Sequence, residues 1–202
     1  MDYWHDFVTE KSWRILQEIN SDFRFILIGG WAVYLWARTL KSKDINIIVD
    51  IKTLSGLKSR YDLRKNDNLR KYEIRKEEID IDIYVPYYSR LIIPPEGIES
   101  ESIEGFKVAR PEHLLILKQG SERERRESEK GEKDRIDILS MLFNCSIDFG
   151  LYYRLLKKHR LEYLLKELIR IVRQFNNYKY MGMTPRKLKL KKQAALERLR
   201  KI

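Results

Sequence analysis

The sequence lacks several features that would assign a protein to a common functional class. It has one cysteine, Cys145, so no disulfide can form within the chain, and its three histidines are too scattered for a zinc site. No apolar run approaches the roughly 18 residues that span a bilayer, and the first residues carry no basic stretch followed by an apolar one. We therefore expect a cytoplasmic protein without a membrane segment.

Acidic residues are scarce at the C-terminal end. The 202 residues include 41 Lys or Arg and 30 Asp or Glu, which gives a net charge of +11. Residues 151–202 hold 16 of the basic residues and three of the acidic ones, so the whole excess lies there. Such a segment is typical of binding to tRNA or another nucleic acid, because Lys and Arg that neutralise phosphates release counterions. A solvated helix surface shows the same pattern, and both interpretations stay open.

The rest of the sequence is apolar enough for a core, and its patterns predict an α/β fold with a small mixed sheet flanked by helices. The expected elements are a helix at 4–19, a strand at 24–28, a helix at 31–40, a strand at 44–50, a helix at 52–60, strands at 69–76 and 78–85, a loop at 86–105, and helices from 111 onward. We expect three parts: a core at 1–110, a helical region at 111–175 and a basic tail at 176–202.

The most specific pattern combines a glycine pair with polar residues on two strands. Gly29-Gly30 lies between a strand and a helix, where backbone amides can approach phosphates at the positive end of the helix dipole. Asp44 and Asn46 share one strand face, and Asp80 and Asp82 share another, because side chains two apart point the same way. If the strands are neighbours, these oxygens converge, and oxygen ligands of this kind suit Mg²⁺ or Mn²⁺.

Each part of this pattern also has a purely structural interpretation. Acids and amides at strand ends occur in ordinary turns, and glycine pairs are common between strands and helices. Asp80 and Asp82 would also suit the solvated face of an edge strand. Arg38 and Lys43, which precede the acids, would contact triphosphate or acceptor nucleic acid, or else are surface charges. The order and spacing of all these residues together favour a site.

In this order and spacing the residues resemble the nucleotidyltransferase superfamily that includes DNA polymerase β. Within it they are most similar to the minimal nucleotidyltransferases and the AbiEii-type toxin group. The resemblance rests on Ile26–Val33, Lys43–Ile47 and Ile79–Ile83, and it continues in Pro111–Lys118 and Lys133–Leu139. It covers roughly residues 20–143 and leaves the basic tail outside.

The resemblance implies transfer of a nucleoside monophosphate from a nucleoside triphosphate to an acceptor hydroxyl, on tRNA or on protein. The resemblance implies that Gly29 and Gly30 bind the triphosphate and that Asp44, Asn46 and Asp82 bind the metal. It implies that Asp82, or alternatively Asp80, activates the hydroxyl. It also implies that Lys118, Lys133 and Asp134 bind the nucleotide. The toxin group also implies an antitoxin partner. An acidic protein surface is a further partner that would suit the basic tail.

One residue departs from the family pattern. Asn46 stands where the second acid of the Asp-x-Asp motif is expected, which removes one negative charge from a site that would hold dications. Three accounts follow: the site works with one metal ion, it has lapsed and the fold serves as a nucleic-acid-binding module, or the residue is an engineered substitution. The sequence leaves all three open.

Overall fold

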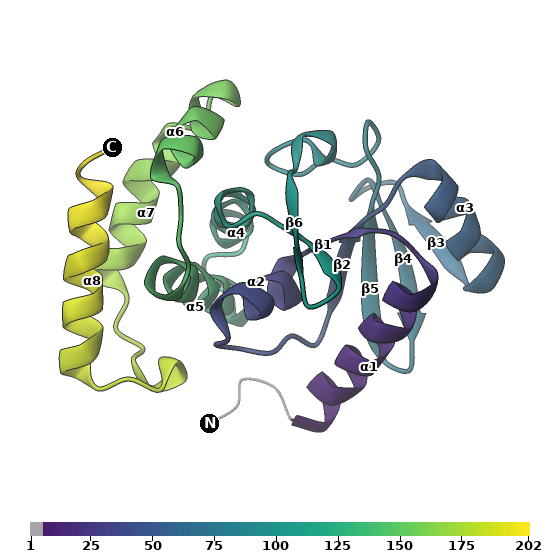
Figure 1. Ribbon diagram of the computed structural model, residues 1–202, viewed down its shortest axis with the longest axis horizontal. Coiled ribbons are helices and arrows are strands. Elements are labelled where there is room, and N and C mark those ends of the chain that lie inside the picture. The colour runs from purple at the N-terminus through teal and green to yellow at the C-terminus, as the bar shows by residue number, and fades with distance from the viewer. Residues whose placement is uncertain (1–5) are drawn as a thin grey trace. The chain divides into compact units, whose positions relative to one another are not determined.

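A computed structural model describes residues 6–202, which form two compact units (Figure 1). The first unit ends at Arg110, and the second runs from Pro111 to Ile202. Residues 4 and 5, where the predicted opening helix begins, lie outside the described part.

The first unit contains a seven-stranded mixed sheet and three helices. Its elements are α1 (Asp6–Asp22), β1 (Ile26–Ile28), α2 (Gly29–Ala37), β2 (Ile45–Ile48), α3 (Ile51–Arg60), β3 (Leu63–Asn66), β4 (Lys71–Lys76), β5 (Ile79–Tyr84), the 3-10 turn η1 (Pro95–Gly97), β6 (Ser100–Ile103) and β7 (Phe106–Ala109). The strand order is β3-β4-β5-β2-β1-β7-β6, in which β2 pairs with β5 in parallel and with β1 antiparallel. The predicted α/β class and mixed sheet are confirmed.

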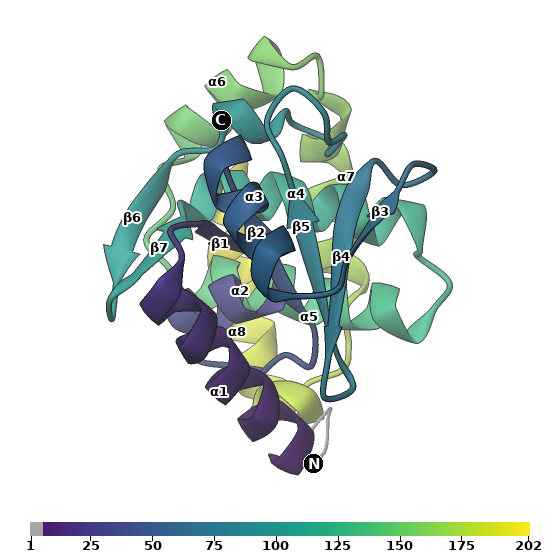
Figure 2. The same ribbon diagram turned by 90° about the vertical axis from the view of Figure 1, so that its right-hand side faces the viewer.

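Strand β5 has one apolar and one polar face. The isoleucines of β5 are buried, and Asp80 and Asp82 alternate with them, so the acids share the opposite face. The register pairs the buried Ile45 of β2 with Ile81 of β5, which continues the apolar face across the parallel pair. Helices α1 and α3 lie over the sheet in Figure 2, and each buries leucine or isoleucine side chains.

Tryptophans anchor α1 and α2 within this unit. Trp31 of α2 is 1% exposed, lies 5.0 Å from Trp13 of α1 between ring centroids, and donates a hydrogen bond of 2.8 Å to the Ser12 hydroxyl. Trp36 donates to the Ala109 carbonyl at 2.9 Å. These contacts fix α2, and with it the glycine turn at the start of that helix, against the rest of the unit.

The second unit is helical. Its elements are α4 (Pro111–Glu124), α5 (Glu129–Asn144), α6 (Phe149–Lys158), α7 (Tyr163–Gln174), the 3-10 turn η2 (Lys179–Met181) and α8 (Pro185–Leu199). The basic helix α8 is packed on α7 and buries Leu188, Ala195 and Leu199. Thr184 caps its first turn by accepting a hydrogen bond from the Lys187 amide. From residue 6 to the C-terminus, no helix is long and apolar enough to cross a bilayer.

The prediction of a loop over residues 86–105 is wrong at its C-terminal end. Residues 100–103 form β6, which pairs with β7 through a turn in which Gly105 has a φ of +82°. Strand β3 is also absent from the predicted elements. Both β3 and β6 are edge strands with exposed polar residues, so their sequences lack the apolar alternation that marks a half-buried strand.

Candidate functional site

The glycine turn lies directly against Asn46. Gly29 has a φ of +70°, a backbone conformation that favours glycine, and it connects β1 to α2 without an intervening loop. A Cβ atom on Gly29 would lie 2.9 Å from Nδ2 of Asn46. This closeness follows from the sheet, because Ile28 and Asn46 are register partners on the antiparallel strands β1 and β2. Glycine is therefore required at position 29 by both conformation and space.

Asn46 also faces Asp82. The two residues are register partners on the parallel strands β2 and β5, so their side chains lie side by side on the polar face of the sheet. Asp44 immediately precedes β2. Burial is the main cause of the raised pKa of Asp82, and the negative charge of Asp44 adds a smaller contribution. The structure thus brings the glycine turn, Asn46, Asp82 and the charge of Asp44 to one region of the sheet.

A lysine that the sequence motifs did not single out binds Asp82. Lys71 of β4 places its Nζ atom 2.7 Å from Oδ1 of Asp82 and 3.0 Å from Oε1 of Glu73. Burial raises the pKa of the Asp82 carboxyl, Lys71 opposes this rise, and the negative charge of Glu73 adds to it. Burial also opposes the charge on Lys71, yet its bonds to the two acids prevail and raise its pKa. Asn66 completes the row by donating to Glu73 at 3.0 Å.

The hairpin of β4 and β5 contained the signal that would have revealed Lys71. Its strands were predicted, and the two-residue turn Glu77-Glu78 sets their register, with Glu73 opposite Asp82. Lys71 is two residues from Glu73 and therefore on the same face. Two acids directly opposite each other repel, so a nearby cation on that face is the expected partner.

Asp80 has a different environment from Asp82. Its side chain is 58% exposed and lies 3.9 Å from Arg75, whereas the Asp82 side chain is 23% exposed. Asn46 is the register partner of Asp82 and not of Asp80. Of the two acids on β5, Asp82 is the one that faces the glycine turn through Asn46.

The two basic residues predicted to contact triphosphate or nucleic acid, Arg38 and Lys43, differ in their ion pairing. Arg38 follows α2 in the left-handed conformation, forms an ion pair with Glu104 and lies over the Tyr34 ring at 5.3 Å. Lys43 is half-buried and forms no ion pair with any residue from 6 to 202. Contact of Arg38 or Lys43 with a triphosphate stays a prediction.

In the helical unit, Lys118, Lys133 and Asp134 belong to a buried ion network. The Lys118 ammonium lies 3.0 Å from Asp134 and 2.6 Å from Asp137, and both aspartates are 1% exposed. Arg125 reaches Asp134 at 2.7 Å, and Lys133 reaches Asp137 at 3.3 Å. Burial lowers the pKa of Lys133, whereas the two aspartates overcome burial and raise that of Lys118. The predicted role of this trio in nucleotide binding stays a prediction.

The donor set around Asn46 fits one divalent cation. Within the described range 6–202, no three His, Cys, Asp or Glu side chains gather in a group that could hold a metal ion. Asp44, Asn46 and Asp82 nevertheless offer two carboxylates and one amide oxygen, all hard donors. Mg²⁺ binds through one or two carboxylates and takes its remaining ligands from water and substrate phosphates. The residues therefore suit one ion bound together with phosphate.

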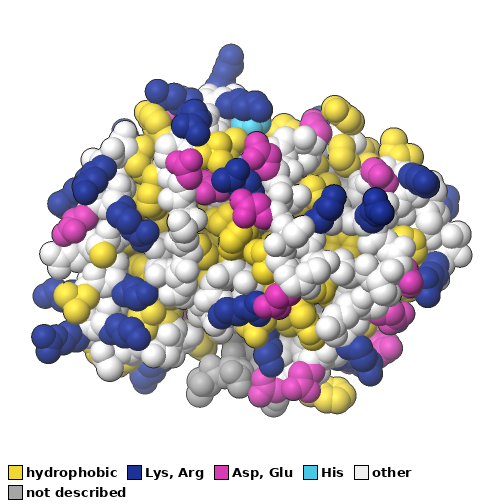
Figure 3. Space-filling model, in the orientation of Figure 1, with side chains coloured by type: hydrophobic (Ala, Val, Ile, Leu, Met, Phe, Trp, Pro, Cys, Tyr) yellow, Lys and Arg dark blue, Asp and Glu magenta, His cyan; other side chains and the backbone are white. Residues whose placement is uncertain are grey.

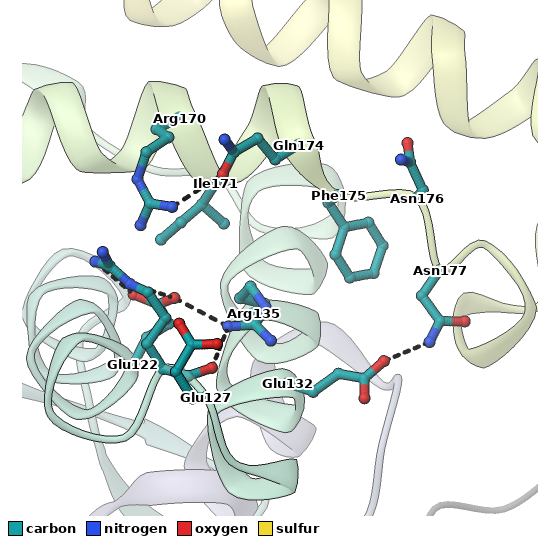
Figure 4. A pocket seen from close by; sticks show the side chains of 11 residues that line it. Glu122, Glu127, Glu132, Arg135, Arg170, Ile171, Gln174, Phe175, Asn176 and Asn177 are labelled. Atoms are coloured by element: carbon teal, nitrogen blue, oxygen red, sulfur yellow. Dashed lines mark hydrogen bonds and ion pairs between the residues drawn. The ribbon is translucent and has the colours of Figure 1, made fainter.

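One cavity of the helical unit is lined by arginines that already have carboxylate partners. It has a volume of about 400 Å³ and is lined in part by Arg126, Arg135 and Arg170 (Figure 4). Each of these arginines has a carboxylate partner, at 2.6 Å for Arg126 with Glu167 and 3.1 Å for Arg135 with Glu122. Because its cations are already neutralised, this cavity offers little attraction for a phosphate.

A groove between α7 and α8 differs from that cavity in the pairing of its cations. It has a volume of about 690 Å³, and its lining includes Tyr178, Lys192 and three exposed cations, Arg173, Lys189 and Arg200. None of these three forms an ion pair with another residue of the described chain, 6–202. Lys192 donates to backbone carbonyls at the end of α7, at 2.8 and 2.7 Å. Figure 3 shows Lys and Arg side chains gathered where α8 lies.

Comparison with known proteins gives matches in structure alone. No protein-family model matches the sequence, and a search of curated proteins finds no match. The crystal structure of a candidate nucleotidyltransferase from Helicobacter pylori is 16% identical, covers 98% of this chain and 96% of its own, and has a TM-score of 0.52. The crystal structure of JHP933, also from H. pylori, is 18% identical, covers 98% and 93%, and has a TM-score of 0.50. The chain therefore has a nucleotidyltransferase-like fold.

Proposed function

We propose that the protein transfers a nucleoside monophosphate from a nucleoside triphosphate to an acceptor hydroxyl and releases pyrophosphate. The observation that carries this proposal is the position of Asn46, which touches the Gly29 turn on one side and faces Asp82 on the other. The glycine turn at the start of α2 thus adjoins oxygen donors that suit a divalent cation.

In the proposed reaction, the amides at Gly29 and Gly30 bind the phosphates at the start of α2, where the helix dipole favours negative charge. Asp44, Asn46 and Asp82 would hold Mg²⁺ or Mn²⁺, which when bound neutralises phosphate charge. Asp82 orients the acceptor hydroxyl and accepts its proton as the oxygen bonds to the α-phosphorus. The bond from that phosphorus to the bridging oxygen breaks, and pyrophosphate leaves.

The transfer is tested with α-labelled nucleoside triphosphates, Mg²⁺ or Mn²⁺, and either tRNA or total protein as acceptor. We expect label on one acceptor, a loss of at least about 100-fold in Asp82→Asn, and little change in Asp80→Asn. The second variant is a matched control, because it removes the same charge two residues away on the same strand face. Equal activity in both variants, or no label with any metal and acceptor, would contradict the proposal.

A second candidate function is nucleic-acid binding without turnover, in a fold that has lost its catalytic charge. Two observations favour it: Asn46 is neutral, and Lys71 already binds Asp82. The groove between α7 and α8 would then carry the function, because unpaired cations beside an aromatic ring suit a single strand. This candidate predicts steep salt dependence of RNA or DNA affinity and no label transfer.

Two further proposals concern partners. Membership of the AbiEii-type toxin group, and with it an antitoxin partner, is supported by the motifs at Lys43–Ile47 and Lys133–Leu139. Binding of an acidic protein surface is supported by the charge of residues 151–202. Co-purification with and without nuclease distinguishes such a partner from nucleic acid, because a contact made through nucleic acid disappears on digestion.

A further inference from the structure

Lys71 differs from the other lysine of its strand in burial and in its carboxylate partners. Its side chain is 13% exposed, and its ammonium bonds to two carboxylates, those of Asp82 and Glu73. The other lysine of β4, Lys76, has one carboxylate partner, Glu18, and its side chain is 23% exposed. Lys71 is thus held on the polar face of the sheet, beside the residues proposed to bind the cation.

The register explains why a cation is needed there. Glu73 lies directly opposite Asp82 on the antiparallel strands β4 and β5. Two negative charges at directly opposed positions destabilise a sheet unless a cation neutralises them. Lys71 supplies that charge from the same face of the same strand as Glu73.

We propose that Lys71 is the resident cation of the site, which competes with a divalent ion for Asp82 and moves wholly onto Glu73 when Asp82 becomes a metal ligand. This inference rests on the proposed function of Asp44, Asn46 and Asp82. Glu73 makes the exchange possible, because the ammonium keeps one carboxylate partner at 3.0 Å after it gives up the other. A lysine with a single partner would be left buried and unpaired.

The proposal predicts opposite effects for the two residues that flank Asp82. Loss of the ammonium removes both a competitor and a positive charge, so divalent cations bind more tightly. Loss of the Glu73 charge leaves Lys71 with Asp82 as its acidic partner, so divalent cations bind more weakly. A structural lysine remote from the proposed cation, such as Lys76, would leave the affinity unchanged.

The test measures the Mn²⁺ dissociation constant of the full chain by electron paramagnetic resonance, without nucleotide. We expect Lys71→Met and Lys71→Gln to bind Mn²⁺ at least about tenfold more tightly, Glu73→Gln to bind it more weakly, and Lys71→Arg to stay within about threefold of the natural protein. Lys76→Met is the matched control, because it breaks a lysine-carboxylate pair on the same strand. The glutamine variant retains a hydrogen-bond donor for Asp82 should the methionine variant fold poorly.

Several outcomes would overturn the role of Lys71. These are an affinity within twofold of the natural protein in both neutral variants, or an equal gain in Lys76→Met. If label transfer by the natural protein accompanies either result, the proposed function stands and this inference alone fails. Absence of Mn²⁺ binding in every variant overturns the role of Lys71, and absence of label transfer as well overturns both. Tighter Mn²⁺ binding by Lys71→Met without label transfer supports the role of Lys71 and contradicts catalysis.

Discussion

Gly29 and Asn46 are in contact across two strands, at a distance that leaves no room for a side chain at position 29. A Cβ atom there would meet Nδ2, Cβ and Cγ of Asn46 at 2.9 to 3.0 Å. The glycine turn and the proposed metal-binding residue therefore form one packed unit, and a change in either displaces the other.

The first prediction concerns Gly29→Ala. The substitution places a side chain in a left-handed conformation and against Asn46, so we expect it to lower the free energy of unfolding by about 2–3 kcal/mol. Gly105→Ala is the control, because Gly105 has a φ of +82° with open space around it. Urea unfolding measures both. An equal loss in the two variants would show that the contact with Asn46 contributes nothing.

The second prediction concerns Asn46→Asp. The new carboxylate lies beside Asp82 and adds the negative charge that the family pattern expects, so we expect binding of Mn²⁺ with a triphosphate to tighten at least about tenfold. Isothermal titration calorimetry measures the affinity of both proteins. Equally weak binding by both would exclude position 46 from any catalytic role.

The third prediction concerns the buried network of the helical unit. Burial opposes the charge of Asp134, but Lys118 and Arg125 prevail and hold its pKa below the ordinary value of 3.8. Its contribution to stability is therefore present above that pH and is lost as pH falls through the lower pKa of the folded state. Asp134→Asn should lower the free energy of unfolding by about 3 kcal/mol at pH 7, and by less below pH about 4.

Chemical denaturation at a series of pH values measures this difference. Glu124→Gln is the control, because Glu124 is an exposed residue of α4, and we expect it to change stability by less than about 0.5 kcal/mol. A loss for Asp134→Asn that is independent of pH would contradict the ionic origin of the stabilisation.

The fourth prediction concerns the groove between α7 and α8. Replacing Arg173, Lys189 and Arg200 together by alanine should reduce the slope of log affinity against log salt by about 2 for single-stranded RNA, because each neutralised phosphate contributes about 0.7. The control removes three basic residues of α6, which lie outside the groove: Arg154, Lys157 and Lys158. Fluorescence anisotropy with RNA and DNA oligonucleotides measures the slopes. An equal change in both variants would assign the binding to general charge.

Local sequence patterns were sufficient to predict the centre of the fold. The alternation of Ile79, Ile81 and Ile83 with acids marks β5, and the run before Gly29 marks β1. The pattern failed at β3 and β6, since edge strands bury few side chains and so need no apolar alternation. Their pairing is determined by neighbouring strands, which local periodicity does not report.

The candidate site was predictable from alternation where residues share a strand, whereas contacts across strands also required the hairpin turn that sets the register. Asp44 with Asn46 follows from a spacing of two, and so does the shared face of Asp80 and Asp82. The bond of Lys71 to Asp82 depends on the hairpin register, which apolar alternation within each strand does not specify. The basic charge of α8 was visible, but its division between Lys192, which binds carbonyls, and unpaired cations depends on packing against α7.

The most direct test of the account is a crystal structure with a non-hydrolysable nucleoside triphosphate and Mn²⁺. We expect an anomalous Mn²⁺ peak between Asp44 and Asp82, phosphate oxygens bonded to the amides at Gly29 and Gly30, and the Lys71 ammonium on Glu73. A nucleotide bound elsewhere, with the ammonium of Lys71 still on Asp82 and no Mn²⁺ beside it, would contradict the account.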